Sequence, residues 1–284
     1  MKTTNRLIIS CLILITNASP HVFANVDTAR AADAPDHASQ TIDKPVKNHL
    51  DPMPDVLAFA VNASAKLKLD KEQLASLKTK AEEHKQQLNE YYTQTSKLEQ
   101  QLHDAVIQDK PLSSIDQLAD SMLQERQNII NIEAAGIEAL QSVVDSKQFQ
   151  QVLELYQTKT PEKPIQLPIA KHVDPMPKLI KVIQENADQL KLTGKQSAAL
   201  KQWQEEREPV LTQQYTAIVN LEKAIYKATL SKESNEKLAE LNDAIMRERM
   251  KVIRGRAFGR EKIKQILNAE QYQQLIEIYR KPAH

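Results

Sequence analysis

The residues of this chain most suited to chemistry occur in a six-residue motif that is present twice. The stretch HLDPMP at 49–54 returns as HVDPMP at 172–177, at an offset of 123 residues. Each copy offers an imidazole, a carboxylate and a thioether. Imidazole with thioether suits copper, and imidazole with carboxylate also accepts zinc or nickel. The motif therefore predicts a metal site with these ligands: His49, Asp51, Met53, His172, Asp174, Met176.

The same motif has a structural interpretation. Asp is a good helix N-cap and Pro suits the first helical position, so Asp51 and Asp174 could start the first helix of each copy. Met53 and Met176 would then be core residues. Because caps are commoner than metal sites, this interpretation is favoured, and the metal site stays open as the alternative.

A second candidate surface is a basic helix in the C-terminal part of the chain. Between 246 and 264 there are eight Arg or Lys residues against Glu248 and Glu261. A solvated helix face is the usual meaning of such a run. Beside apolar side chains it could also attract acidic, partly unfolded proteins and then hold them by apolar contact. The predicted client-binding residues are Met246, Arg247, Arg249, Met250, Ile253, Arg254, Phe258.

These candidates lie on a chain that is duplicated without insertion or deletion. For example, LKL at 67–69 returns at 190–192. A gapless duplication gives both copies one backbone plan, so we predict two similar units, 49–157 and 172–280. The Pro-containing segment 158–171 is expected to link them.

Within each unit, the spacing of apolar residues predicts long helices. From Leu74 to Ala105, seam residues follow one another in steps of three and four. This is a heptad seam on a helix of about 36 residues, or roughly 54 Å. A third helix is expected at about 113–142 and 236–265, antiparallel to the long one. The predicted fold is all-α, each unit being a long helical hairpin flanked by two short helices.

One proline and two histidines interrupt the pattern of the long helices. Pro209 is expected to kink the second long helix or restart it, because proline removes a backbone hydrogen bond and clashes with the preceding turn. His84 and His103 lie on the first long helix, and Arg207 and Tyr226 stand at the matching positions. We therefore interpret both histidines as seam or surface residues.

The N-terminal residues predict export. Residues 1–24 have the form of a signal peptide, with Lys2 and Arg6 before a mostly apolar run that is too short to span a membrane. Cys11 is the only cysteine, so the mature chain has no disulfide and no thiolate ligand. Residues 25–48 have the composition of a flexible leader. We expect a soluble periplasmic protein without stable membrane insertion.

Charge and composition argue against several function classes. Loss of Lys2 and Arg6 takes the formal net charge from +1 to −1, which gives no general case for nucleic acid or an anionic membrane as partner. The chain has no serine–histidine pattern, no phosphate-cradling glycine loop and no zinc-protease helix motif. We therefore predict that it is not an enzyme.

A five-residue pattern marks the expected start of four helices. Leu-Thr-x-x-Gln occurs at 192–196, and looser versions occur at 69–73, 144–148 and 267–271. The second residue of each stretch can cap the first turn of the helix that follows. On an exported, cysteine-free helical chain, this pattern resembles the Spy/CpxP (LTXXQ) family of periplasmic proteins. The resemblance covers both units.

The resemblance implies a fold and a function. Family members are small helical proteins that commonly pair into a curved cradle, so two copies in one chain imply a covalent pseudo-dimer. The expected function is that of an ATP-independent chaperone or envelope-stress adaptor that binds unfolded envelope proteins. The alternative is a copper-, zinc- or nickel-binding or sensing protein of the ZraP/CnrX kind that uses the repeated motif. The periplasmic domain of a sensor kinase is a further expected partner.

Overall fold

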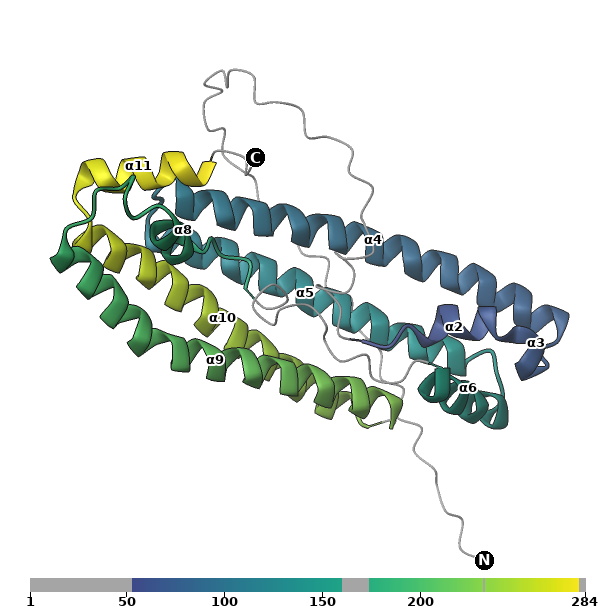
Figure 1. The fold of residues 1–284 in the computed structure, drawn as a ribbon. Coiled ribbons are helices and arrows are strands. Elements are labelled where there is room, and N and C mark those ends of the chain that lie inside the picture. Colours follow the sequence, from purple (N-terminus) through teal and green to yellow (C-terminus); the bar gives the residue numbers. More distant parts are fainter. Residues whose placement is uncertain (1–52, 160–173, 232, 281–284) are drawn as a thin grey trace, which may run out of the picture. The chain divides into compact units, whose positions relative to one another are not determined.

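The computed structural model describes residues 53–159, 174–231 and 233–280, which form helices and no strand (Figure 1). The all-α prediction is confirmed. The first half of the sequence supplies α2 (Val56–Asn62), α3 (Ser64–Leu67), α4 (Lys71–Ile107), α5 (Leu112–Gln141) and α6 (Ser146–Lys159). The second half supplies α8 (Leu179–Glu185), α9 (Gly194–Leu230), α10 (Asn235–Ile266) and α11 (Ala269–Arg280). None of these helices combines the length and the apolar character that a bilayer-spanning segment needs.

Three predicted segments fall wholly or mostly outside the described residues. They are the signal peptide at 1–24, the leader at 25–48 and the linker at 158–171. Of the linker, only Thr158 and Lys159 are described, and both belong to α6.

The helix bounds in the two halves are related by the offset of the sequence duplication. The bounds of α2 and α8 differ by 123 at both ends, from 56 to 179 and from 62 to 185, and α4 and α9 show the same relation. α5 and α10 begin at the same offset, as do α6 and α11. The long helices contain 37 residues each, against the 36 or so expected. The single turn of α3 was not expected from the sequence.

Local side-chain caps explain where the long and the last helices begin. At α4, Gln73 N donates to Asp70 Oδ1 at 2.8 Å, and Asp70 N donates to Gln73 Oε1 at 3.1 Å. The same reciprocal pair of hydrogen bonds joins Thr193, Asp145 and Asn268 to the glutamine three residues after each of them. Each cap satisfies backbone donors that the helix cannot, and contributes about 1 kcal/mol. The four predicted caps are confirmed.

The glutamines of these caps also join two helix starts to each other. Gln73 Nε2 donates to Gln148 Oε1 at 2.9 Å and to the carbonyl of Val143 at 3.2 Å. In the second half, Gln196 Nε2 donates to Gln271 Oε1 at 2.7 Å. The start of the long helix and the start of the last helix are therefore fixed against one another in each half.

The first short helices do not begin where the structural interpretation of the DPMP motif places them. α2 and α8 begin two residues after Pro54 and Pro177. Asp55 caps α2 by accepting from Ala58 N at 3.2 Å, whereas Lys178 stands at the N-cap of α8 and makes no side-chain cap. Asp174 therefore does not cap α8, and the expected role was wrong because other donors bind this carboxylate. Asp51 lies outside the described residues.

Pro209 lies inside α9, which runs unbroken from Gly194 to Leu230. The expectation that the helix restarts there was wrong. A proline inside a helix costs about 3 kcal/mol. Burial of the apolar face of α9 on both sides of Pro209 outweighs that cost.

The core mixes residues of both halves where α5 packs against α10. α4 also packs along α5, and α9 along α10 (Figure 1). Met176, from the second half, is buried in a cluster with first-half residues including Leu102, Ala105, Ile115, Met122. Met53, from the first half, is buried in a cluster with second-half residues including Ile225, Ala228, Leu238, Ile245. The two lists occupy equivalent positions of the duplication.

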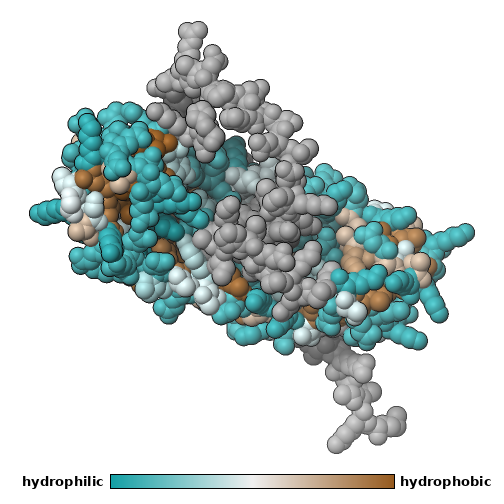
Figure 2. All heavy atoms as spheres, in the orientation of Figure 1, coloured by the Kyte–Doolittle hydropathy of each residue, from teal (hydrophilic) through white to brown (hydrophobic). Residues whose placement is uncertain are grey.

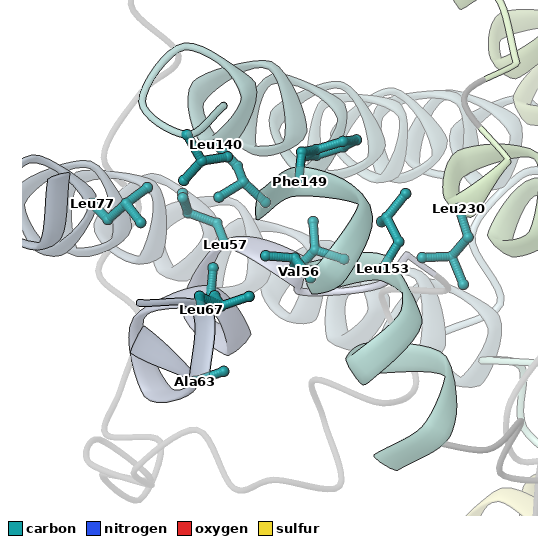
Figure 3. Packing of buried hydrophobic residues seen from close by; sticks show 12 residues of the cluster. Val56, Leu57, Ala63, Leu67, Leu77, Leu140, Phe149, Leu153 and Leu230 are labelled. Carbon is teal, nitrogen blue, oxygen red and sulfur yellow. The ribbon is translucent and has the colours of Figure 1, made fainter. Parts of the chain in front are cut away.

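The clusters formed by the short helices also exchange one residue each. Leu230, the last residue of α9, is buried with first-half residues and lies beside Leu153 in Figure 3. Its counterpart Ile107, the last residue of α4, is buried with second-half residues such as Leu179 and Leu275. Each half therefore completes an apolar cluster of the other.

Two ion pairs are buried at equivalent positions. Arg126 lies 2.7 Å from Glu99, and Arg249 lies 2.5 Å from Glu222. Burial, and next the positive charge of Arg249, lower the pKa of Arg126 to about 10, while Glu99 opposes this change. Loss of one partner would leave its mate charged in the core, a cost of about 3–5 kcal/mol.

Candidate metal site

The repeated motif does not bring its predicted ligands together among the described residues. His49, Asp51 and His172 lie outside them. Met53 and Met176 are buried in different apolar clusters. The Met53 sulfur accepts a hydrogen bond from Thr229 Oγ1 at 3.5 Å.

Asp174 is bound by protein donors. Its Oδ2 accepts from the Tyr215 hydroxyl at 2.6 Å and from Arg256 Nε at 2.7 Å, and its Oδ1 accepts from Met176 N at 3.1 Å. Burial, and next the charge of Asp174, raise the pKa of Tyr215, which keeps the phenol protonated as a donor. Because Arg256 already neutralises the carboxylate, Asp174 is poorly placed to bind a cation.

A different set of ligand types does converge in the first half. Asp55, His84 and Glu133 each offer a ligand atom, and these atoms lie within 4.8 Å of one another. They come from three elements: Asp55 is the N-cap of α2, His84 lies on α4, and Glu133 lies in the C-terminal third of α5. His84 is 8% and Glu133 2% exposed, so these two side chains are screened from bulk water, whereas Asp55 is partly exposed.

Glycine allows His84 to sit this close to α5. A Cβ atom at position 136 would lie 2.5 Å from His84 Nε2, closer than atoms can approach. The same nitrogen lies 3.6 Å from Glu133 Oε2 and 3.2 Å from the carbonyl oxygen of Ile132. A side chain at 136 would therefore push the imidazole away from Glu133.

One imidazole and two carboxylates form a ligand set that zinc accepts, with nickel or ferrous iron as other candidates. Ligand atoms around tetrahedral zinc are about 3.3–3.5 Å apart. Here they lie within 4.8 Å of one another, so small side-chain movements would close the set. The cluster contains no sulfur, which disfavours cuprous copper. A hollow lined by Asp55, His84 and Tyr92 borders the cluster and offers an entry path.

No pattern in the sequence points directly to Asp55, His84 and Glu133 as a set. Its three residues are far apart in the chain. The sequence predicts a seam or surface position for His84, because the second unit has Arg207 in its place. The seam assignment holds, because His84 is buried against α5. One usable hint existed: a histidine in an apolar seam needs a polar partner on the facing helix.

The equivalent positions of the second half are all occupied by basic residues. Lys178, Arg207 and Arg256 stand where the first half has Asp55, His84 and Glu133. The candidate cation site therefore has no copy there.

Comparison with known proteins adds no assignment: no family model, no curated protein and no solved structure matches the chain. The resemblance to the Spy/CpxP family therefore stays a prediction.

The predicted client-binding residues on α10 differ widely in exposure. Arg249 and Ile253 are 3% and 1% exposed, and Met246 and Met250 are partly buried. Arg247, Arg254 and Phe258 are exposed, and Arg254 Nε lies 2.9 Å from Asp116. Of the seven predicted residues, only these three are exposed.

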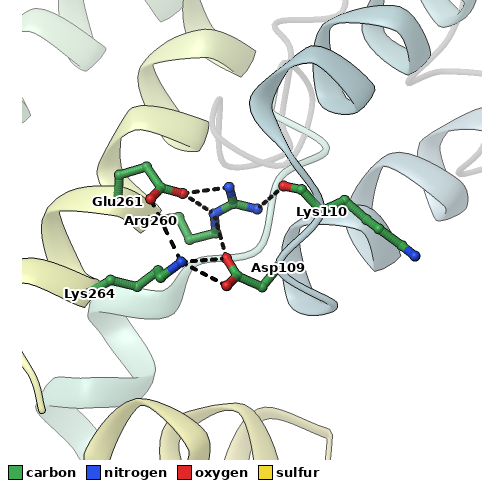
Figure 4. A network of polar contacts seen from close by, with 5 residues as sticks. All are labelled: Asp109, Lys110, Arg260, Glu261 and Lys264. Atoms are coloured by element: carbon green, nitrogen blue, oxygen red, sulfur yellow. Dashed lines mark hydrogen bonds and ion pairs between the residues drawn. The ribbon is translucent and has the colours of Figure 1, made fainter. Parts of the chain in front are cut away.

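Other basic residues of α10 bind the end of α4. Arg260 Nη1 donates to the carbonyl of Lys110 at 2.8 Å, and Lys264 Nζ lies 2.7 Å from Asp109 Oδ2 (Figure 4). Arg260 also pairs with Glu261 on its own helix. The basic run thus serves in part to hold α10 against the turn between α4 and α5.

Within the described ranges of the chain, few large apolar side chains are strongly exposed. The face seen in Figure 2 is mostly hydrophilic, with small apolar groups between the polar side chains. Among the described residues, the large hydrophobic side chains that are strongly exposed are those of Leu112, Val210 and Phe258. Phe258 is therefore the apolar residue of the predicted client set that is most available.

Proposed function

We propose that this protein binds a divalent transition metal ion, with zinc as the first candidate, at Asp55, His84 and Glu133. The observation that supports this proposal is the convergence of three ligand types from α2, α4 and α5. It is a metal-binding function like the predicted alternative, with a different set of ligands.

The electrostatics of the cluster favour a cation. Two carboxylates that share a small, mostly buried space repel each other, and a divalent ion between them removes that repulsion. Protonation of His84 beside Glu133 is the competing way to supply positive charge. Since protons and metal compete for the imidazole, metal affinity is expected to fall as the pH is lowered.

Binding would also tie the first short helix to the hairpin. Asp55 lies at the start of α2, whereas His84 and Glu133 face each other across α4 and α5. Metal would add a link between these elements, so bound metal is expected to raise the stability of the fold.

The test is calorimetric titration of the metal-free chain with zinc, nickel and copper. We expect one zinc per chain, and a loss of affinity of at least about 10–100-fold in both His84→Ala and Glu133→Gln, since loss of even a supporting residue has that effect. The matched control is a His49→Ala/His172→Ala double variant, which removes the histidines of the repeated motif. If zinc binding survived His84→Ala and was lost in the His49→Ala/His172→Ala variant, the repeated motif would be the metal site and this proposal would be wrong.

We also propose that the two sequence halves form the covalent pseudo-dimer that the resemblance implies. This is supported by the equivalent positions of Met53 and Met176, and of Ile107 and Leu230, each buried among residues of the other half. Export to the periplasm stays a prediction from residues 1–24.

Client binding also stays a prediction. Of the predicted client-binding residues on α10, Phe258, Arg247 and Arg254 are exposed and could contact a client. Arg249 and Ile253 are buried and could not. This prediction requires that the chain suppress aggregation of an unfolded protein, and that Phe258→Ser abolish the suppression.

A further inference from the structure

A pocket of about 270 Å³ lies between α8, α9 and α10, with Val106 of α4 at its edge. Its volume is just below the roughly 300–1,000 Å³ of pockets for drug-sized ligands, so it would suit a small molecule. Its walls combine cations with apolar side chains. The apolar part is formed by Met176, Ile180, Trp203, Leu211, Ile263.

The charge of the pocket is predominantly positive. Lys178, Arg207 and Arg260 line it, together with Arg256, while Glu208 is the carboxylate on its wall. Arg256 is neutralised by Asp174, and Arg260 pairs with Glu261 and Asp109, so neither can supply the main charge for a ligand.

Arg207 differs from these neighbours. Its side chain is partly buried, and it makes no hydrogen bond or ion pair with any residue in the described part of the chain. A Cβ atom at position 255 would lie 2.4 Å from its Nη2, so Gly255 provides the space into which the guanidinium fits. A partly buried guanidinium without an anion is electrostatically costly, and a carboxylate or phosphate would offset that cost by bidentate hydrogen bonds.

An aromatic wall stands beside this guanidinium. Trp203 lies one turn before Arg207 on α9, and its indole ring packs against Gly259. A Cβ atom at position 259 would lie 3.0 Å from that ring. Gly259 therefore makes room for the indole as Gly255 does for the guanidinium. A ligand that met both groups would need an anionic head and an apolar body.

From this geometry we propose that the second half binds a small amphiphilic anion, its carboxylate or phosphate on Arg207 and its apolar part against Trp203 and Leu211. The site occupies positions equivalent to those of the candidate metal site, with the charge reversed. The inference does not rest on metal binding, because the two sites share no residue.

Trp203 is the only tryptophan of the chain, so its fluorescence reports on this pocket alone. The full chain, in EDTA to remove metal, is titrated with octanoate, octyl phosphate, uncharged octanol and inorganic phosphate. We expect a saturable fluorescence change with one or both octyl anions, and an affinity at least tenfold weaker for octanol and for inorganic phosphate. The preferred octyl anion then identifies the head group.

Arg207→Gln should weaken binding of the preferred anion at least tenfold, and Arg207→Lys should weaken it less. The matched control is Lys201→Gln, which removes an exposed charge from the same helix outside the pocket and should change affinity less than twofold. Circular dichroism checks that each variant is folded, and calorimetry on the unaltered chain provides a readout that needs no variant. Octanol binding as tightly as the anions, no saturable change with either octyl anion, or unchanged affinity in Arg207→Gln would each overturn the proposal.

Discussion

The side chain of His84 reaches α5 only because residue 136 is glycine. Gly136→Ala would place a Cβ 2.5 Å from Nε2, so the imidazole must move away from Glu133. We expect weaker zinc binding and a loss of about 1–3 kcal/mol from overpacking, reduced by the better helix propensity of alanine. Zinc titration and chemical denaturation measure the two effects.

Gly194→Ala is the matched control, because no atom lies within 4 Å of where its Cβ would be. It should leave zinc affinity unchanged and stability equal or slightly higher. If Gly136→Ala behaved in the same way, the packing of His84 against α5 would not control the site.

Charge alone did not reveal which residues of α10 face solvent. Arg249 belongs to a basic run of the kind that usually marks an exposed helix face. It is buried because Glu222, on α9, supplies a carboxylate at 2.5 Å. A sequence pattern on one helix cannot show a partner on another, so the basic run alone wrongly predicts that Arg249 is exposed.

At the scale of helices, Pro209 gives the clearest test of how packing outweighs local preference. It is exposed in α9, and Gln86 occupies the equivalent exposed position of α4. We expect Pro209→Ala to stabilise the fold by up to about 3 kcal/mol, because it restores a backbone hydrogen bond and removes a steric clash. The free energy of unfolding in urea measures the change.

The mirrored substitution Gln86→Pro should destabilise α4 by a similar amount. If Gln86→Pro left the free energy of unfolding unchanged, proline would carry no cost at this position. Packing along α9 would then not be needed to explain why Pro209 is tolerated.

Helix starts were predictable because their determinants are local. Asp70, Thr193, Asp145 and Asn268 each cap a helix through a glutamine three residues later, and both members of the pair are visible in the sequence. The role of Asp174 was not predictable. It depends on Tyr215 and Arg256, which come from two other helices.

Across the fold, Met53 and Met176 are each buried among residues of the other sequence half. Met53→Ala removes a first-half side chain from a cluster of second-half residues, at a cost of about 2–5 kcal/mol. We expect faster amide hydrogen exchange in α9 and α10, far from the substitution in sequence. Exchange measured by mass spectrometry resolves this by segment.

Met176→Ala is the reciprocal variant and should speed exchange in α4 and α5. Leu77→Ala is the control, because it should cost a similar free energy of unfolding within the cluster of α2, α4, α5 and α6. If Met53→Ala affected only first-half helices, the hairpins would unfold independently.

The set of ligands at the candidate metal site could not be predicted from the sequence, because it depends on how separate helices pack. Asp55, His84 and Glu133 meet only after α2 has docked on the α4–α5 hairpin, and the duplication gives no repeated histidine to mark them. The duplicated DPMP motif carries residue types that can bind metal, yet Met53 and Met176 are core residues.

The exchanged residues Ile107 and Leu230 bear on what the covalent connection between the halves contributes. A protease cut between residues 159 and 174 would leave two fragments, each with an apolar cluster that only the other can complete. The fragments would stay together as a noncovalent pair. The peptide linkage then acts chiefly by raising the effective concentration of one half near the other, so a nicked protein should dissociate only on dilution.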